Sequence, residues 1–206
     1  HFNVQGGGAI FSQYIMQFQS EDLKGYLVPQ IAIDQAKDCD RLLLRLYQSF
    51  KESKKYISPK GTASPAHIYV RYDNAFARIN LKLIANDLMD MILNPRDIYY
   101  LPFTVCKLAK LKSATLEQKL IRYLDFSKIC CEDVCLPQDD TDYYPSLKTI
   151  RREVLLTVMD ALKNFPTSDN FSRIRKIYET SDDKDAKTVA EKTLCVIRKK
   201  MVKNTG

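Results

Sequence analysis

Three cysteines lie close together in the chain, at Cys130, Cys131 and Cys135. Thiolates are good zinc ligands, but a structural zinc site usually takes four ligands arranged in pairs. Neither His1 nor His67 stands at a metal-type spacing from this cluster. We therefore expect no metal ion. We interpret these cysteines as small buried side chains at a helix end, and we expect the thiols of the chain to be reduced.

Catalytic chemistry has few candidate residues. A cysteine nucleophile needs a histidine base, and His67 is the one histidine that follows the first residue. The carboxylates of Asp87 and Asp90 lie on a helical pattern, where solvated surface charge is the usual explanation. The chain has six glycines, three of them at 6–8, which excludes a phosphate-binding glycine loop. The sequence predicts no catalytic residue and no cofactor, and an enzyme built around His67 is the third hypothesis.

Basic residues are concentrated near the end of the chain. The formal net charge is +7, with −4 over 126–145 and +6 over 146–206. A basic ridge raises the local potential and can follow a phosphate backbone or an acidic protein surface. The alternative is ordinary solvated charge on helix faces and at helix C-termini. The candidate contacts for a nucleic acid or an acidic partner are Arg151, Arg152, Arg173, Arg175, Lys176, Arg198, Lys199, Lys200 and Lys203.

Tyrosine is plentiful, with twelve in the chain. Exposed tyrosine is favoured at protein interfaces because it offers a large rigid contact area with a hydrogen-bonding tip. Two adjacent pairs near prolines are therefore candidate interface aromatics, namely Tyr99, Tyr100, Tyr143 and Tyr144. Packing of these rings under a loop is equally compatible with the sequence.

Apolar residues recur at helical spacing over most of the chain. The clearest predicted helices cover 9–19, 38–55, 75–93, 146–164, 168–179 and 183–203. A brief alternation at 67–72 is typical of a short strand, although the surrounding pattern favours a helix. The chain is therefore predicted to be all-α.

Polar residues and prolines mark the expected helix ends. Pro29 is expected to kink its segment or to start a new turn. Thr115 followed by Gln118 is a capping-box pattern that predicts the start of a helix. Ser168 and Asp183 are the expected N-caps of the last two helices.

The domain organisation follows from these breaks. Residues 1–8 are interpreted as a flexible lead or an added linker, and 9–206 as one helical domain. Within it we expect sub-units over 9–57, 65–131 and 146–206, joined by loops at 58–65 and 132–145. Each helix is too narrow to bury its apolar stripe alone, so we expect an irregular stack of antiparallel helix pairs, either an α-solenoid or a helical bundle.

The closing helices resemble the paired helices of HEAT and armadillo repeats, most clearly over 146–203. The resemblance rests on their apolar positions, which include Ile150, Val154, Val158, Phe171, Ile174, Val189, Leu194 and Ile197. Membership of that α-solenoid superfamily implies a curved superhelix whose groove binds a protein segment or a nucleic acid. It implies no chemistry.

The leading hypothesis is a non-catalytic scaffold that binds a segment of a partner protein in a groove between helices. The second hypothesis is a helical domain that binds DNA or RNA through the basic C-terminal ridge. No run of residues approaches the roughly 18 apolar residues of a membrane helix, so we expect no membrane contact. The expected location is intracellular, in the nucleus or the cytoplasm.

Overall fold

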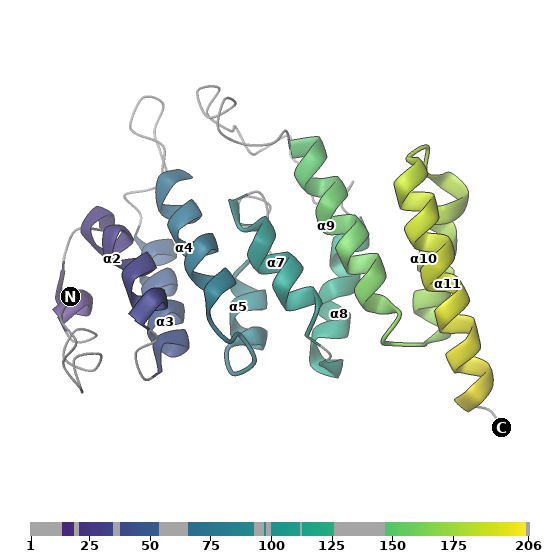
Figure 1. Ribbon diagram of the computed structural model, residues 1–206, viewed down its shortest axis with the longest axis horizontal. Helices are drawn as coiled ribbons and strands as arrows, with labels where there is room; N and C mark the ends of the chain where they lie inside the picture. The colour runs from purple at the N-terminus through teal and green to yellow at the C-terminus, as the bar shows by residue number, and fades with distance from the viewer. Residues whose placement is uncertain are drawn as a thin grey trace. The chain divides into compact units, whose positions relative to one another are not determined.

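The computed structural model is helical in the part of the chain that it describes, and that part contains no strand (Figure 1). The described residues are 14–18, 21–34, 38–53, 66–92, 97, 100–111, 113–125 and 147–204. The all-α prediction is confirmed for these residues. The alternation at 67–72 lies inside α4 (Ala66–Arg78), so the strand alternative is wrong there.

The helices fall into two compact units, with the boundary between Thr104 and Val105 inside α7 (Pro102–Ala109). The first unit holds α2 (Glu21–Asp34), α3 (Cys39–Glu52), α4 and α5 (Ala85–Met91). The second holds α8 (Ala114–Arg122), the short 3-10 helix η2 (Tyr123–Asp125), α9 (Leu147–Leu162), α10 (Ser168–Thr180) and α11 (Lys184–Asn204). The joints expected at 58–65 and 132–145 lie outside the described residues, so they and the three sub-units stay predictions.

In the first unit, α2 and α4 pack against each other and approach closely at Gly25. A Cβ on Gly25 would lie 3.2 Å and 3.3 Å from the two γ-carbons of Ile68. This contact joins the N-terminal halves of both helices, as expected for helices that run in the same direction. In the sequence α3 lies between them, and it runs in the opposite direction. Lys24 near the start of α2 donates to Ser49 near the end of α3 at 3.3 Å.

The helix α2 continues through Pro29 to its end at Asp34, so the expected new turn is wrong. Proline has no N–H to donate to the carbonyl four residues earlier, which belongs to Gly25. Arg71 of α4 donates to that carbonyl in a long hydrogen bond of 3.5 Å, and its guanidinium lies 3.8 Å from the ring centre of Tyr26. A side chain of α4 thus partly replaces the backbone bond that the proline removes.

Aromatic rings fill the core of the first unit. The buried rings are those of Tyr47, Phe50, Tyr69, Tyr72, Phe76 and Tyr100. The rings of Tyr47 and Tyr72 meet edge to face at 5.1 Å, and those of Tyr69 and Tyr100 stack at 4.8 Å. Such pairs add about 1 kcal/mol beyond the burial of their area. The core therefore depends on rings from α3, from α4 and from the segment before α7.

A buried polar network lies beside these rings. The phenol of Tyr47 donates to one carboxylate oxygen of Asp97 at 2.6 Å, and Lys51 forms an ion pair with the other oxygen. Lys51, at the end of α3, also donates to the carbonyl of Met91 at the end of α5. Burial raises the pKa of Asp97, and the ammonium of Lys51 opposes the rise. Lys51 therefore joins the C-terminal ends of α3 and α5.

A carboxylate of α4 caps the first turn of α7. Asp73 is buried and accepts hydrogen bonds from the backbone N–H of Thr104 at 2.8 Å and from its hydroxyl at 2.7 Å, with a longer bond from the N–H of Phe103. Burial raises the pKa of Asp73 from 3.8 to about 6, and the hydrogen bonds from Thr104 and Phe103 oppose that rise. The orphan amides of a helix start are thus satisfied by a distant residue.

The helix predicted over 75–93 is wrong as a single element, because the chain turns between α4 and α5. The side chain of Asn80 accepts from the N–H of Lys82 at 3.1 Å, and Ile84 donates to the carbonyl of Leu81. An asparagine that bonds the backbone two residues on competes with the helix. Leu81 and Ile84 are buried, so the apolar spacing continues through the turn and does not indicate that the helix is interrupted.

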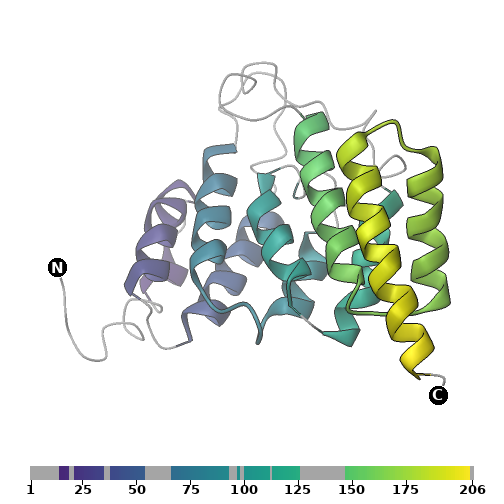
Figure 2. The same ribbon diagram turned by 45° about the vertical axis from the view of Figure 1, so that its right-hand side comes forward.

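The second unit confirms the three closing helices, α9, α10 and α11, which pack together (Figure 2). Arg152, near the start of α9, pairs with Asp183 and Asp185 at the start of α11. At the other end, Lys200 of α11 donates to the carbonyl of Lys163 just after α9 at 2.9 Å. These contacts show that α9 and α11 run in the same direction, with α10 returning between them in the sequence.

The helix caps agree only in part with the sequence prediction. Asp183 is confirmed, since its carboxylate accepts from the N–H groups of Asp185 and Ala186. The cap of α10 is Thr167, not Ser168, because the Thr167 hydroxyl accepts from the N–H of Asn170. The helix start predicted at Thr115 is confirmed to within one residue, because α8 begins at Ala114, but the N-cap is Ser113 and the capping box is wrong. Neighbouring Ser and Thr residues offer equivalent oxygens, so spacing alone does not choose between them.

The close contact between α2 and α4 predicts that Gly25→Ala is destabilising. We expect a loss of about 1 kcal/mol in the free energy of unfolding, because overpacking costs more than the better helix propensity of alanine gains. In an Ile68→Ala background the obstructing γ-carbons are gone, and the same change should be neutral or stabilising. Urea denaturation of the four proteins measures this coupling. An equal effect of Gly25→Ala in both backgrounds would contradict the contact.

The buried Asp73 predicts a pH dependence of stability. Its pKa in the folded chain, about 6, lies above the unfolded value of 3.8, so the folded state holds the proton more tightly. Its contribution to stability is complete below about pH 4 and is lost as the pH rises through about 6, by up to about 3 kcal/mol. Asp73→Asn stays neutral and should lack this loss. Urea denaturation at several pH values compares the two, and parallel profiles would exclude the prediction.

Candidate functional site

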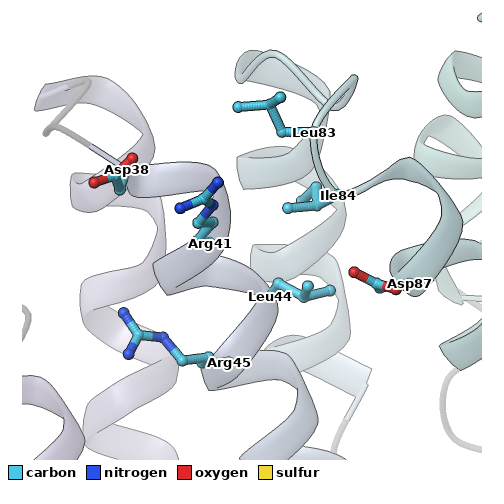
Figure 3. A pocket seen from close by; sticks show the side chains of 7 residues that line it. All are labelled: Asp38, Arg41, Leu44, Arg45, Leu83, Ile84 and Asp87. Carbon is cyan, nitrogen blue, oxygen red and sulfur yellow. The ribbon is translucent and has the colours of Figure 1, made fainter.

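A cavity of about 450 Å³ opens between α3 and the turn that leads into α5, within the first unit (Figure 3). Its lining consists of Asp38, Arg41, Leu44, Arg45, Leu83, Ile84 and Asp87. All of these residues come from the N-terminal halves of the two helices or from the turn. Because Lys51 joins the opposite ends of α3 and α5, the cavity lies at the ends that this residue does not hold together.

The apolar part of the lining includes one side chain that folding leaves in solvent. Ile84 is buried and Leu44 is half-buried, whereas Leu83 is 70% exposed. Figure 3 shows Leu83 and Ile84 pointing from the turn toward α3. Leu83 is exposed because its neighbours in the turn, Leu81 and Ile84, occupy the buried positions. An apolar surface of this kind gains free energy when another apolar group covers it.

The acidic and the basic residues of the lining differ in whether the fold stabilises their charge. Asp38 precedes the first turn of α3 and Asp87 lies in the first turn of α5, where a helix dipole favours negative charge. Arg41 and Arg45 lie one helical turn apart on α3 and are exposed. Among the described residues, neither guanidinium forms an ion pair. The two arginines are therefore the charges of the cavity that the fold itself does not use.

The lining contains no nucleophile with a base beside it, and His67 is exposed on α4, outside the lining. Over the described ranges, no three His, Cys, Asp or Glu side chains come together in a way that could hold a metal ion. Cys130, Cys131 and Cys135 lie outside those ranges, so the interpretation of the cysteine cluster stays a prediction. The chemistry that the cavity itself offers is apolar contact together with recognition of negative charge.

Several basic candidates are engaged inside the second unit. Arg152 pairs with Asp183 and Asp185, and its guanidinium holds the pKa of Asp183 below the usual range. Arg173 pairs with Asp169, and Arg175 pairs with Glu179, each one turn away along α10. Lys200 donates to the carbonyl of Lys163. These four side chains have acidic or carbonyl partners within the fold.

The remaining basic candidates fall into two groups. Lys176, Arg198, Lys199 and Lys203 are exposed, and in the described part of the chain their side chains have no recorded partner. The side chain of Arg151 lies outside the described structure. The free positive charge of the second unit is therefore smaller than its formal charge suggests, and part of it lies toward the end of α11.

The candidate tyrosines divide in a similar way. Tyr100 is 2% exposed and stacks on Tyr69, so the structure places it in the core and not at a surface. Tyr99, Tyr143 and Tyr144 lie outside the described residues, and their interface role stays a prediction.

Sequence reasoning missed the cavity. On their own, Arg41 and Arg45 fit the polar side of an amphipathic α3. The available signal was the spacing of four residues between the arginines, with Leu44 directly before Arg45. It could not be interpreted without the turn that brings Leu83 opposite α3.

In the described part, none of the helices is both long and apolar enough to span a membrane. Neither a protein-family model, nor a curated protein, nor a solved structure matches the chain. The geometry of the site is therefore the basis for a functional conclusion.

Proposed function

We propose that the chain is a non-catalytic interaction module that binds a segment of a partner protein in the cavity between α3 and the turn before α5. The observation that carries this proposal is the exposed Leu83 beside Leu44 and Ile84, together with Arg41 and Arg45, which have no ion-pair partner among the described residues. A volume of about 450 Å³ is within the range of roughly 300–1,000 Å³ that is usual for ligand sites. It is large enough for a few side chains of a peptide.

The framework of the cavity supports binding without a large rearrangement. Leu44 projects from α3, which is held to α5 through Lys51, and Ile84 is anchored in the core. Side chains on rigid elements lose little additional freedom when a partner binds. The site is thus partly preorganised, and its exposed leucine provides an apolar contact for the partner.

We further propose that the helices stack in the manner of HEAT or armadillo repeats. In the first unit α2 and α4 run in the same direction with α3 returning between them, and α9, α10 and α11 repeat this order in the second. Alternation of this kind is expected of an α-solenoid, which stacks helix pairs. Grooves between successive helices are the expected binding sites of such a stack.

The proposal predicts that peptides selected on this chain depend on Leu83. A library of displayed random peptides is selected on the full chain, and fluorescence anisotropy measures the affinity of the enriched peptides. Leu83→Asp should weaken their binding about tenfold or more, because burial of one leucine is worth about 1.5–3 kcal/mol. The fold should survive, since the side chain is 70% exposed.

A matched control is Val202→Asp on α11, where the side chain is 67% exposed and lies outside the cavity. It should leave peptide affinity unchanged. Enriched peptides that bind the wild type, the Leu83 variant and the Val202 variant equally well would exclude the cavity as the binding site.

A second candidate function is nucleic-acid binding through the exposed end of α11. It is favoured by Arg198, Lys199 and Lys203, which remain exposed and have no recorded partner in the part of the structure that is described. Phosphate backbones bind clusters of cations of this kind without base-specific contacts. The paired Arg173 and Arg175 are less available, because Asp169 and Glu179 already neutralise them.

This second candidate predicts a difference between two pairs of substitutions. Labelled single-stranded RNA and duplex DNA are titrated at several salt concentrations. Arg198→Gln with Lys199→Gln should reduce the slope of log affinity against log salt by between about 1 and 2, since each phosphate contact contributes about 0.7–0.9. Arg173→Gln with Arg175→Gln should reduce this slope less, because both arginines are already paired with acids. Absence of binding at low salt would exclude nucleic-acid binding, and equal slopes in all proteins would exclude the end of α11 as the binding site.

A further inference from the structure

We infer that the cavity selects a partner segment in which an aspartate or glutamate lies about one helical turn from a large apolar side chain. This inference rests on the proposed function and specifies the chemistry of its partner. The apolar side chain would cover Leu83 between α3 and the turn, and the carboxylate would face Arg41 and Arg45.

The charged residues of the lining explain why the cavity should prefer a negatively charged group of the partner. Asp38 and Asp87 complement the N-termini of α3 and α5, so their negative charge already has a role in the fold. Arg41 lies in the first turn of α3, where the helix dipole does not favour a cation. The described residues provide no ion-pair partner for Arg41 or for Arg45. A carboxylate from a partner would supply the missing counter-charge.

The spacing of the arginines sets the geometry of the carboxylate. Residues four apart on a helix have side chains about 5–6 Å apart at the Cβ atoms. Two guanidinium groups at that spacing can bind one carboxylate from both sides, or two carboxylates on successive turns of a partner helix. The exposed apolar surface of Leu83 lies at the same opening, so a bound segment would partly exclude water from these ion pairs.

A peptide fits this lining better than a nucleic acid does. The cavity combines the arginines with three aliphatic side chains, those of Leu44, Leu83 and Ile84. A phosphate backbone offers negative charge but no aliphatic group to cover them. A peptide with adjacent apolar and acidic residues supplies both contacts.

The test is a reversal of charge in the cavity. Peptides selected on the wild-type chain should contain more Asp and Glu than Lys and Arg within four residues of their apolar anchor. Arg41→Glu with Arg45→Glu should weaken such an acidic peptide by about tenfold or more, since two attractive pairs become repulsive. A version of the same peptide with lysine in place of the acids should bind this variant better than it binds the wild type.

The control is Arg198→Glu with Lys199→Glu, which makes the same change in net charge on α11. It should leave the affinity of both peptides within about twofold. Circular dichroism confirms that each variant is folded, and the substituted side chains are exposed in the native chain. A similar loss in the control would assign the effect to overall charge and overturn the inference.

Two further outcomes separate this inference from the proposed function. Peptides that depend on Leu83 but show no acidic preference and no reversal would overturn the inference and leave the proposed function intact. Peptides that do not depend on Leu83 would overturn both.

The chain also contains an acidic segment of its own at 132–145, with five Asp and Glu residues. A synthetic peptide of these residues is the third probe. If it binds the cavity as tightly as the selected peptides, and its binding reverses with Arg41 and Arg45, the occupant is a segment of this chain and the separate partner is excluded. Absence of such binding, together with reversal for the selected peptides, supports the partner.

Discussion

The contact between the half-buried Lys51 and the buried Asp97 is the constraint on which the first unit depends. Its ammonium pairs with Asp97 and donates to the carbonyl of Met91, while Tyr47 holds the other oxygen of Asp97. Asp97 is buried and Lys51 is half-buried, so loss of the lysine would leave the carboxylate without its counter-charge in a site that water barely reaches. The C-terminal ends of α3 and α5 are therefore held together, and the aromatic core forms beside this contact. The cavity opens at the opposite ends of the same two helices.

Charge in this chain has two different roles. In the second unit, Arg173 and Arg175 pair with acids one turn away within α10. Arg152 pairs with Asp183 and Lys200 donates to the carbonyl of Lys163, so these two residues join α9 and α11. Exposed pairs of this kind contribute little to stability, typically below about 1 kcal/mol each. They nevertheless reduce the charge that is free to attract a partner. Arg41 in the first unit has no such partner among the described residues, which is why the proposed binding mode assigns it a contact with the partner.

The spacing of apolar residues along the chain predicted where helices form better than it predicted where they begin and end. The periodicity of the closing helices was sufficient because each buries one continuous stripe. The break at 79–84 was missed because Leu81 and Ile84 preserve apolar spacing through a turn that Asn80 stabilises. The helix α2 continues past Pro29, and Arg71 of α4 partly replaces the backbone bond that the proline removes. Asn80 is a polar residue that the apolar periodicity does not take into account, and Arg71 lies on another helix.

By itself, the sequence determined the all-α class, the closing helices and the sign of the charge, because these depend on neighbouring residues along the chain. Only the tertiary structure decided which charges are free and where an apolar side chain is left in solvent. Tyr100 has a sequence context typical of an interface and yet lies in the core, since Tyr69 covers it. Arg41 and Leu83 are ordinary surface residues in the sequence, and the fold brings them together in the lining of one cavity where α3 meets the turn. Burial and ion pairing depend on distances between helices, which local spacing does not encode.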